Sequence, residues 1–146
     1  MAKGLDISTV GSRNIGATNV AREIGLKWGL LTLLLDCLKG LGPSAAAFAF
    51  YKGGFNPATV AAVSGLAAFI GHQFSLFLKF NGGKGVATAL GVFLVLCPLC
   101  VAGSLALFVV LVYLMGYISL ASMGSSLAMP FFLLLSTKPP MHAGVA

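Results

Sequence analysis

The chain is dominated by five apolar runs that are separated by short polar or glycine-rich breaks. A helix needs about 20 mostly apolar residues to cross a bilayer, and in lipid it must satisfy its own backbone hydrogen bonds. Only 8% of the 146 side chains are charged and 58% are apolar, which excludes a large soluble domain. We therefore expect an all-α integral membrane protein with about five transmembrane helices and no strands. The expected spans are residues 28–51, 58–78, 86–98, 99–117 and 120–135, the third being short, in a single transmembrane domain over residues 1–146.

Two spans separate the polar residues 1–27 from the glycine-rich break at 79–85, so both segments are expected on one membrane face. The first 24 residues hold no apolar core of a signal peptide, so insertion is expected to use the internal spans. Loops rich in lysine and arginine stay in the cytoplasm. Both segments are therefore predicted to be cytoplasmic loops. The cations on this face would be Lys3, Arg13, Arg22, Lys27, Lys79 and Lys84, against Lys52 and Lys138 on the other.

The formal net charge of +6 indicates anionic partners. Nucleic-acid binding needs lysines and arginines clustered on one face, and here they lie singly between apolar runs. The expected partners are the lipid bilayer and small anions, with no nucleic acid.

The three cysteines, Cys37, Cys97 and Cys100, lie in or beside apolar runs and are expected to act as small hydrophobic side chains. Cys97 and Cys100 have the spacing of a redox motif, but the strand and the neighbouring cations of such a motif are missing. A disulfide scaffold of the secreted kind is not expected. No cluster has the spacing of metal ligands, so neither a metal nor a cofactor is predicted.

Three polar side chains fall inside the first two spans. Asp36 and Lys39 are three residues apart, which places them on one helical face where their charges can neutralise each other. Such a pair is costly in lipid, so it must hold helices together or shape a polar site, and we favour the structural role. His72, near the end of the second span, is predicted to be a structural donor, with catalysis as the alternative.

The break around Lys84 contains three glycines, Gly82, Gly83 and Gly85, directly before a helix. Successive backbone N–H groups in such a loop can converge on an anion that also meets the positive end of the helix dipole. Lys84 adds a full charge, and Thr88 follows in the first helical turn. The spacing is not that of a nucleotide P-loop. A plain glycine-rich loop whose lysine anchors at lipid headgroups is the alternative.

The segment from Gly11 to Arg22 combines hydroxyl, amide and guanidinium groups with glycines that allow close backbone approach. This composition is typical of an anion site, and its polar members include Ser12, Asn14, Thr18 and Asn19. The alternative is a solvated loop in which Thr18 or Asn19 caps a short helix.

Three stretches of the sequence, GSRNIGATN at 11–19, LLLDCLKG at 33–40 and GHQFSLFLKFNGGKGVAT at 71–88, resemble the bacterial acyl-phosphate:glycerol-3-phosphate acyltransferase family, often called PlsY. The resemblance extends in order from about residue 6 to 123. It implies an enzyme of the bacterial inner membrane that transfers a fatty acyl group from acyl phosphate to sn-glycerol 3-phosphate. The product would be lysophosphatidic acid, in the first acylation of phospholipid synthesis.

The resemblance also implies roles for residues of both loops. Ser12 and Arg22 match the first motif of the family, and the residues from Gly82 to Gly85 match its glycerol-phosphate loop. Arg22, Lys84 and the loop N–H groups would offset the repulsion between two phosphates, and Ser12 would donate a hydrogen bond. A substrate phosphate, rather than a side chain, would take the hydroxyl proton. The predicted catalytic residues are Ser12, Arg22 and Lys84, and the predicted phosphate-binding residues are Asn14, Thr18, Asn19, Gly82, Gly83, Gly85 and Thr88.

The family has seven helices, one before the first motif and a third motif near the C-terminus that contributes a His and an Asn. These 146 residues match spans two to six. We therefore expect a weak or inactive enzyme unless another chain supplies the remaining parts. Two alternatives use the same residues differently: a small membrane transporter or channel, and a non-catalytic assembly partner.

Overall fold

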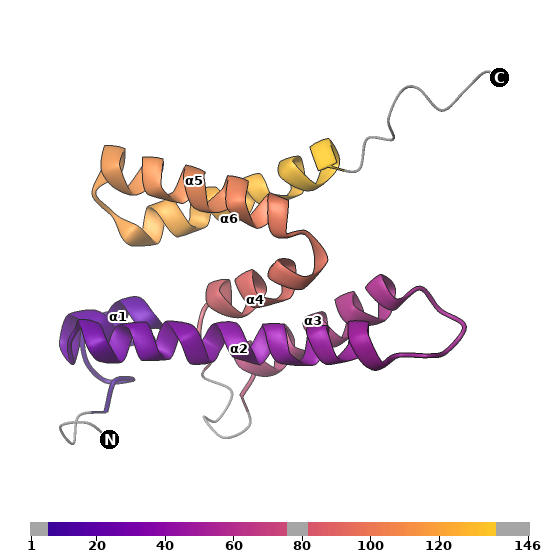
Figure 1. Cartoon of the computed structure of the whole chain (residues 1–146). Helices are drawn as coiled ribbons and strands as arrows, with labels where there is room; N and C mark the ends of the chain where they lie inside the picture. Colours follow the sequence, from indigo (N-terminus) through magenta and orange to yellow (C-terminus); the bar gives the residue numbers. More distant parts are fainter. Residues whose placement is uncertain (1–5, 76–81, 137–146) are drawn as a thin grey trace. The chain divides into compact units, whose positions relative to one another are not determined.

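The computed structural model describes residues 6–75 and 82–136, and these residues form six helices without a strand (Figure 1). The prediction of an all-helical membrane protein is confirmed. The helices are α1 (Ala17–Glu23), α2 (Leu26–Phe50), α3 (Pro57–Gln73), α4 (Val86–Leu96), α5 (Pro98–Met115) and α6 (Ile118–Ser136).

The helices agree with the apolar runs to within a few residues, with two differences. Among the described residues, α2, α5 and α6 are long and apolar enough to cross a membrane. Helix α4 has only 11 residues, about 16 Å of helical rise, so the third run is as short as its sequence indicates. Helix α1 lies in the segment predicted as a loop, and the second helical run ends at Gln73, while the predicted residues 76–78 lie outside the described ones.

Residues up to Leu96 form one compact unit and residues from Cys97 onward form another. In the first unit, α2 and α4 each pack against α3 and against each other. Gly65 of α3 lies against Ser44 of α2 and Val92 of α4. Asp36, which precedes Ser44 on α2, lies beside His72, which follows Gly65 on α3. The two helices are therefore antiparallel. The prediction of a single transmembrane domain stays a prediction.

Glycines allow α2 and α4 to approach each other backbone to backbone. A Cβ on Gly40 would collide with the backbone carbonyl of Thr88, and a Cβ on Gly91 would collide with the carbonyl of Cys37 and lie 2.7 Å from the amide nitrogen of Leu41. Such contacts are the usual basis of helix association in lipid, because lipid tails are as apolar as the side chains they surround. The crossing of α2 and α4 therefore depends on residues without side chains.

Helix α1 packs against the start of α2 through the same kind of contact. Gly29 of α2 is buried, and a Cβ there would meet the side chain and backbone of Ala21. Gly25 and Gly29 are spaced as a Gly-x-x-x-Gly pattern of close helix contacts, and in this fold Gly29 lies against α1.

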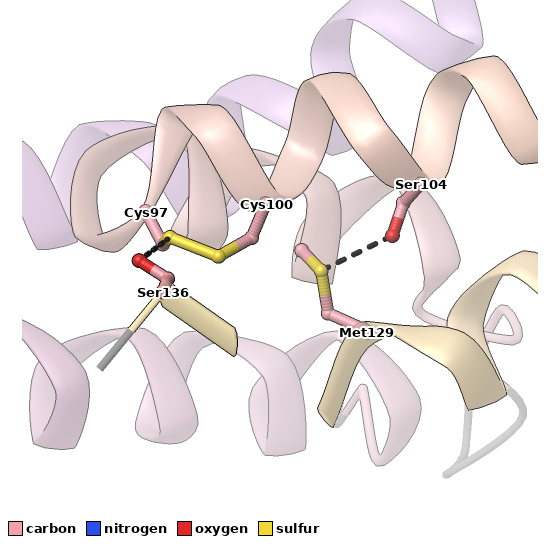
Figure 2. The surroundings of a disulfide bond; sticks show 5 residues. All are labelled: Cys97, Cys100, Ser104, Met129 and Ser136. Atoms are coloured by element: carbon pink, nitrogen blue, oxygen red, sulfur yellow. Dashed lines mark hydrogen bonds between the residues drawn. A yellow bond between two sulfur atoms is a disulfide. The ribbon is translucent and has the colours of Figure 1, made fainter. Parts of the chain in front are cut away.

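The second unit is a hairpin of α5 and α6, joined at Gly116, whose φ of 70° is left-handed. Gly103 of α5 faces Phe132 of α6, Ser104 donates to Met129 Sδ at 3.2 Å (Figure 2), and nearer the turn Gly124 of α6 faces Leu111 of α5. The pair is therefore antiparallel.

The expectation that all three cysteines act as small hydrophobic side chains is wrong for two of them. Cys97 and Cys100 form a disulfide at the start of α5, and Cys97 Sγ lies 3.7 Å from Ser136 Oγ of α6 (Figure 2). Because Pro98 begins α5, the two cysteines share its first turn, with their Cα atoms 5.3 Å apart. Cys37 is a free thiol in α2.

The contact between α2 and α4 generates a prediction about two glycines of one helix. Gly40→Ala places a Cβ against the Thr88 carbonyl, which should lower the free energy of unfolding by about 1–3 kcal/mol. Gly42→Ala meets no atom within 4 Å and should stabilise α2 by up to about 1 kcal/mol. Thermal unfolding of both variants in detergent measures the difference. Equal effects of the two substitutions would contradict this packing.

Candidate active site

The glycine-rich loop before α4 returns onto the end of α3. The Gly82 N–H donates to the carbonyl oxygen of Gln73 at 3.0 Å, and a Cβ on Gly82 would collide with the carbonyls of His72 and Gln73. The Gln73 carbonyl belongs to the last turn of α3 and would otherwise lack a partner. The preceding loop residues Lys79 and Asn81 lie outside the described residues.

The next glycines of this loop also lie against α3. Gly83 and Gly85 are buried, and a Cβ on Gly83 would lie 2.5 Å from His72 Nε2. Gly85 has a φ of 75°, which favours glycine, and faces the ring of Phe69. Lys84 between them is exposed and forms no ion pair with a described residue. The loop thus holds one solvent-accessible cation directly before the first turn of α4.

Three polar side chains meet behind this loop. Lys39 Nζ lies 2.8 Å from Asp36 Oδ1, so the predicted pair is formed within α2, and its structural role stays a prediction. His72 Nδ1 lies 3.7 Å from the same carboxylate oxygen. The side chains of Asp36 and His72 are 9% and 5% exposed, whereas that of Lys39 is 57% exposed. Two of the three are therefore enclosed by helices, and Lys39 reaches the surface of the unit.

Asn19 organises the loop that precedes α1. Its Oδ1 accepts from the Ser12 N–H at 3.0 Å, and its Nδ2 donates to the carbonyls of Ile7 and Val10 at 3.3 and 3.1 Å. With three hydrogen bonds and 3% exposure, the side chain is committed to the protein. These contacts occupy the groups with which Asn19 would bind a phosphate, so its predicted role as a phosphate ligand stays a prediction.

The other predicted residues of the first loop are more accessible. Ser12 is exposed, and Arg13 beside it has a left-handed φ of 56°. The Asn14 Oδ1 accepts from the Gly16 N–H at 2.8 Å, which leaves its amide nitrogen available. The alternative in which Thr18 or Asn19 caps a helix is wrong in its detail: α1 exists, but Gly16 is its N-cap and no side chain caps it.

Two short turns shape the start of this loop. The Ser8 hydroxyl and N–H donate to Asp6 Oδ1 at 2.7 and 3.0 Å, and these hydrogen bonds lower the pKa of the Asp6 carboxyl. Gly11, with a φ of 59°, brings the backbone against Asn19 and Glu23 of α1. The loop is thereby folded back on the helix that follows it.

Thr88 differs from the other predicted phosphate ligands. Its side chain is fully buried, its backbone carbonyl lies against Gly40 of α2, and its hydroxyl has no hydrogen-bond partner among the described residues. A direct contact of this hydroxyl with a substrate phosphate would need the helices to separate. Its role therefore stays a prediction, with the structure favouring a position in the packed interior.

The two loops belong to one end of the first unit. Helix α1 packs on the start of α2, Lys84 precedes the start of α4, and both α2 and α4 run antiparallel to α3. Arg22, in the last turn of α1, is exposed, as are Ser12 and Lys84. No hydrogen bond or ion pair joins described residues of the two loops. The structure thus shows both loops separately, and their joining into one site stays a prediction.

Two residues that support the second loop, Phe69 and Gln73, could not be singled out from the sequence. Phe69 is one apolar residue among many in its span, and Gln73 contributes only a backbone carbonyl. Among residues 6–75 and 82–136, no three His, Cys, Asp or Glu side chains gather as they would around a metal ion. The chemistry available at the two loops is thus that of cations, hydroxyl and amide groups that bind and neutralise anions.

The sequence matches a family model described as glycerol-3-phosphate acyltransferase over residues 1–146. It is 54% identical to the glycerol-3-phosphate acyltransferase of Geobacter sulfurreducens, over 99% of this chain and 72% of that protein. The protein of the same name from Trichlorobacter lovleyi is 52% identical, over 94% of this chain and 69% of its own length.

Two solved structures are similar in fold. One is a crystal structure of PlsY, an integral membrane glycerol 3-phosphate acyltransferase, in its glycerol 3-phosphate form. It has a TM-score of 0.85 and 38% identity, over 94% of this chain and 67% of that one. The lysophosphatidic acid form has a TM-score of 0.80 and 37% identity, with 88% and 64% coverage. These relatives decide against the transporter alternative, and the chain belongs to the glycerol-3-phosphate acyltransferase family of integral membrane enzymes.

Proposed function

We propose that this chain carries the phosphate-binding part of an enzyme that uses acyl phosphate as its donor. The observation that carries the proposal is the exposed Lys84, held between Gly83 and Gly85 at the start of α4. A lysine at a helix N-terminus, beside unpaired backbone N–H groups, suits a phosphate group. The names of the relatives supply the acceptor, glycerol 3-phosphate.

The reaction follows from the chemistry of an acyl phosphate, which is already an activated anhydride. The 1-hydroxyl of glycerol 3-phosphate attacks the acyl carbon, the bond from that carbon to the phosphate oxygen breaks, and inorganic phosphate leaves. A phosphate oxygen of the substrates takes the hydroxyl proton, so no side-chain base is needed. The products are lysophosphatidic acid and inorganic phosphate.

The protein contributes charge and position to this step. Two phosphate groups repel each other as they approach, and Lys84 and Arg22 offset that repulsion. The Ser12 hydroxyl, which is exposed and has no hydrogen bond to a described residue, donates to a substrate oxygen. Asn14 offers its free amide nitrogen to the same anion, and Thr18, in the first turn of α1, offers its hydroxyl. In this proposal Asn19 holds the backbone of Ser12 and does not itself bind substrate.

We further propose that both loops face the cytoplasm of a bacterium, with the protein in its inner membrane. The excess of lysine and arginine near these loops supports this orientation. A second observation is the Cys97–Cys100 disulfide, which follows α4 at its far end from Lys84. Disulfides persist outside the reducing cytoplasm, which fits the same orientation.

Turnover of two acyl donors, measured with and without the Lys84 charge, tests both the proposed donor and the proposed role of the loop. Purified chain in detergent should convert labelled glycerol 3-phosphate with palmitoyl phosphate and not with palmitoyl-CoA. Lys84→Ala should lower kcat/KM by about 10²–10³-fold, the usual effect of removing one preorganised charge donor. Lys27→Ala, which removes an exposed lysine at the start of α2, is the matched control and should retain activity.

Three results would count against this proposal. Turnover with palmitoyl-CoA would contradict the donor, and equal activity of the Lys84 and Lys27 variants would contradict the role of the loop. No lysophosphatidic acid from the unmodified chain would favour an inactive family member or a non-catalytic assembly partner.

The role of Asn19 is tested by a pair of isosteric substitutions. Asn19→Asp keeps the acceptor for the Ser12 N–H but turns a second oxygen toward the carbonyls of Ile7 and Val10, which should cost about 1–3 kcal/mol. Asn14→Asp keeps its one hydrogen bond to Gly16 and should leave the loop intact. Proteolysis of the segment before α1 should accelerate in the first variant alone. Equal protection in both would show that Asn19 does not hold this loop.

The orientation predicts which side of the membrane each lysine reaches. In a Cys37→Ser background, a membrane-impermeant maleimide added to intact spheroplasts should label Lys52→Cys, just beyond the end of α2. Lys27→Cys should react only after the membrane is permeabilised. The reverse pattern would place the loops outside the cytoplasm.

A further inference from the structure

The imidazole of His72 stands between a buried carboxylate and the backbone of the glycine-rich loop. On one side, Nδ1 lies 3.7 Å from Asp36 Oδ1. On the other, Nε2 is the atom nearest to the place where a Cβ of Gly83 would stand, at 2.5 Å. The side chain is 5% exposed, so its two nitrogens are enclosed by protein on both sides.

This position separates His72 from the solvent-exposed part of the site. A general base must reach the hydroxyl of the substrate, and a ring that is enclosed between α2 and the Gly83 backbone is poorly placed to do so. A carboxylate beside one ring nitrogen sets the orientation of an imidazole, and such supporting partners decide where the neighbouring group stands. Nothing in the acyl transfer proposed above uses Asp36 or His72.

The loop itself is defined by what α3 presents to it. The Gly82 N–H donates a hydrogen bond to the Gln73 carbonyl. Gly83 lies against the His72 ring, and Gly85 lies against the Phe69 ring. Lys84 is the exposed member between these contacts. A displacement of the ring would therefore shift the backbone on which Lys84 is carried.

We infer that Asp36 and His72 are positioning residues that set the place of the Lys84 loop, with Asp36 of α2 orienting the ring of His72 and the ring supporting the backbone at Gly83. Lys39 is the other partner of Asp36, but it is 57% exposed and forms no hydrogen bond or ion pair with residues 82–85 of the loop, so its contribution is small. The inference rests on the proposed function for its substrate, glycerol 3-phosphate, while its structural content is independent of turnover.

The first test follows the loop without any substrate. Hydrogen–deuterium exchange of the Gly82–Gly85 amides in the detergent-solubilised chain should accelerate about tenfold in His72→Ala, corresponding to a local opening that is easier by about 1.4 kcal/mol. Asp36→Asn should accelerate it in the same direction. Lys39→Gln is the matched control and should leave the exchange unchanged. Asp36→Asn keeps the shape of the side chain, so it carries the test if His72→Ala does not fold.

The second test uses the steric contact directly. Gly83→Ala places a Cβ against the ring and should accelerate loop exchange in the unmodified chain. In the His72→Ala background, the space left by the ring should accept that Cβ, so Gly83→Ala should have no further effect. An equal effect of Gly83→Ala in both backgrounds would overturn the inference, as would exchange that responds to Lys39→Gln as strongly as to Asp36→Asn.

Kinetic measurements distinguish a positioning role of His72 from a role as a catalytic base and from a role in stability alone. His72→Ala should raise KM for glycerol 3-phosphate about tenfold, with a smaller change in kcat, because orienting partners act on binding geometry. A loss confined to kcat would overturn the inference in favour of a catalytic base. A loss of thermal stability with unchanged KM and unchanged loop exchange would overturn it in favour of a purely structural role. Failure of the proposed function appears instead as no product from the unmodified chain, and the exchange measurements still decide the inference in that case.

Discussion

The close approach of α2 and α4 at Gly40 and Gly91 is the contact on which the rest of the first unit depends. Between helices in lipid there is little hydrophobic driving force, so association relies on close packing and on polar contacts. Where two backbones meet, every neighbouring side chain is brought to within a few ångströms of the other helix. Helix α3 adds the polar contacts, since its His72 lies beside Asp36 of α2 and against Gly83 in the loop before α4.

The polar groups of this unit are arranged in two different ways. Around Asn19, the amide oxygen and both amide N–H groups form hydrogen bonds, and the result is a defined loop. At Arg22, Ser12 and Lys84, side chains are exposed and are left without partners among the described residues. A site that binds anions needs both arrangements, because the free cations are effective only if the backbone that carries them stays in place.

Apolar length was sufficient to predict α2 to α6, whereas the placement of both loops on one membrane face, inferred from the two spans between them, stays a prediction. Contacts between helices could not be predicted in this way, because they depend on how each helix is rotated about its axis. Asp36 and His72 meet although they belong to different helices, α2 and α3. The end of α3 at Gln73 could not be predicted either, because the Gln73 carbonyl is paired with the N–H of Gly82, a residue well beyond this helix in the sequence. Helix α1 was predicted only as an alternative, because its sequence is polar and its N-cap residue, Gly16, has no side chain that would mark the start of a helix. The roles of Asn19 and Thr88 depend on burial, which a polar residue type does not reveal.

The level of Asp36 along α2 has a consequence for how the substrates reach the site. Asp36 lies ten residues beyond Leu26, about 15 Å along the helix axis, and the Gly83 backbone is at its level. The glycine-rich loop is therefore recessed along α2 relative to the loop that precedes α1, while both remain in the same half of the unit. In the proposed reaction, a recessed loop would let a long-chain donor remain dissolved in the bilayer throughout. Only the small, water-soluble partner would have to travel inward, and the product would already be in place as a membrane lipid.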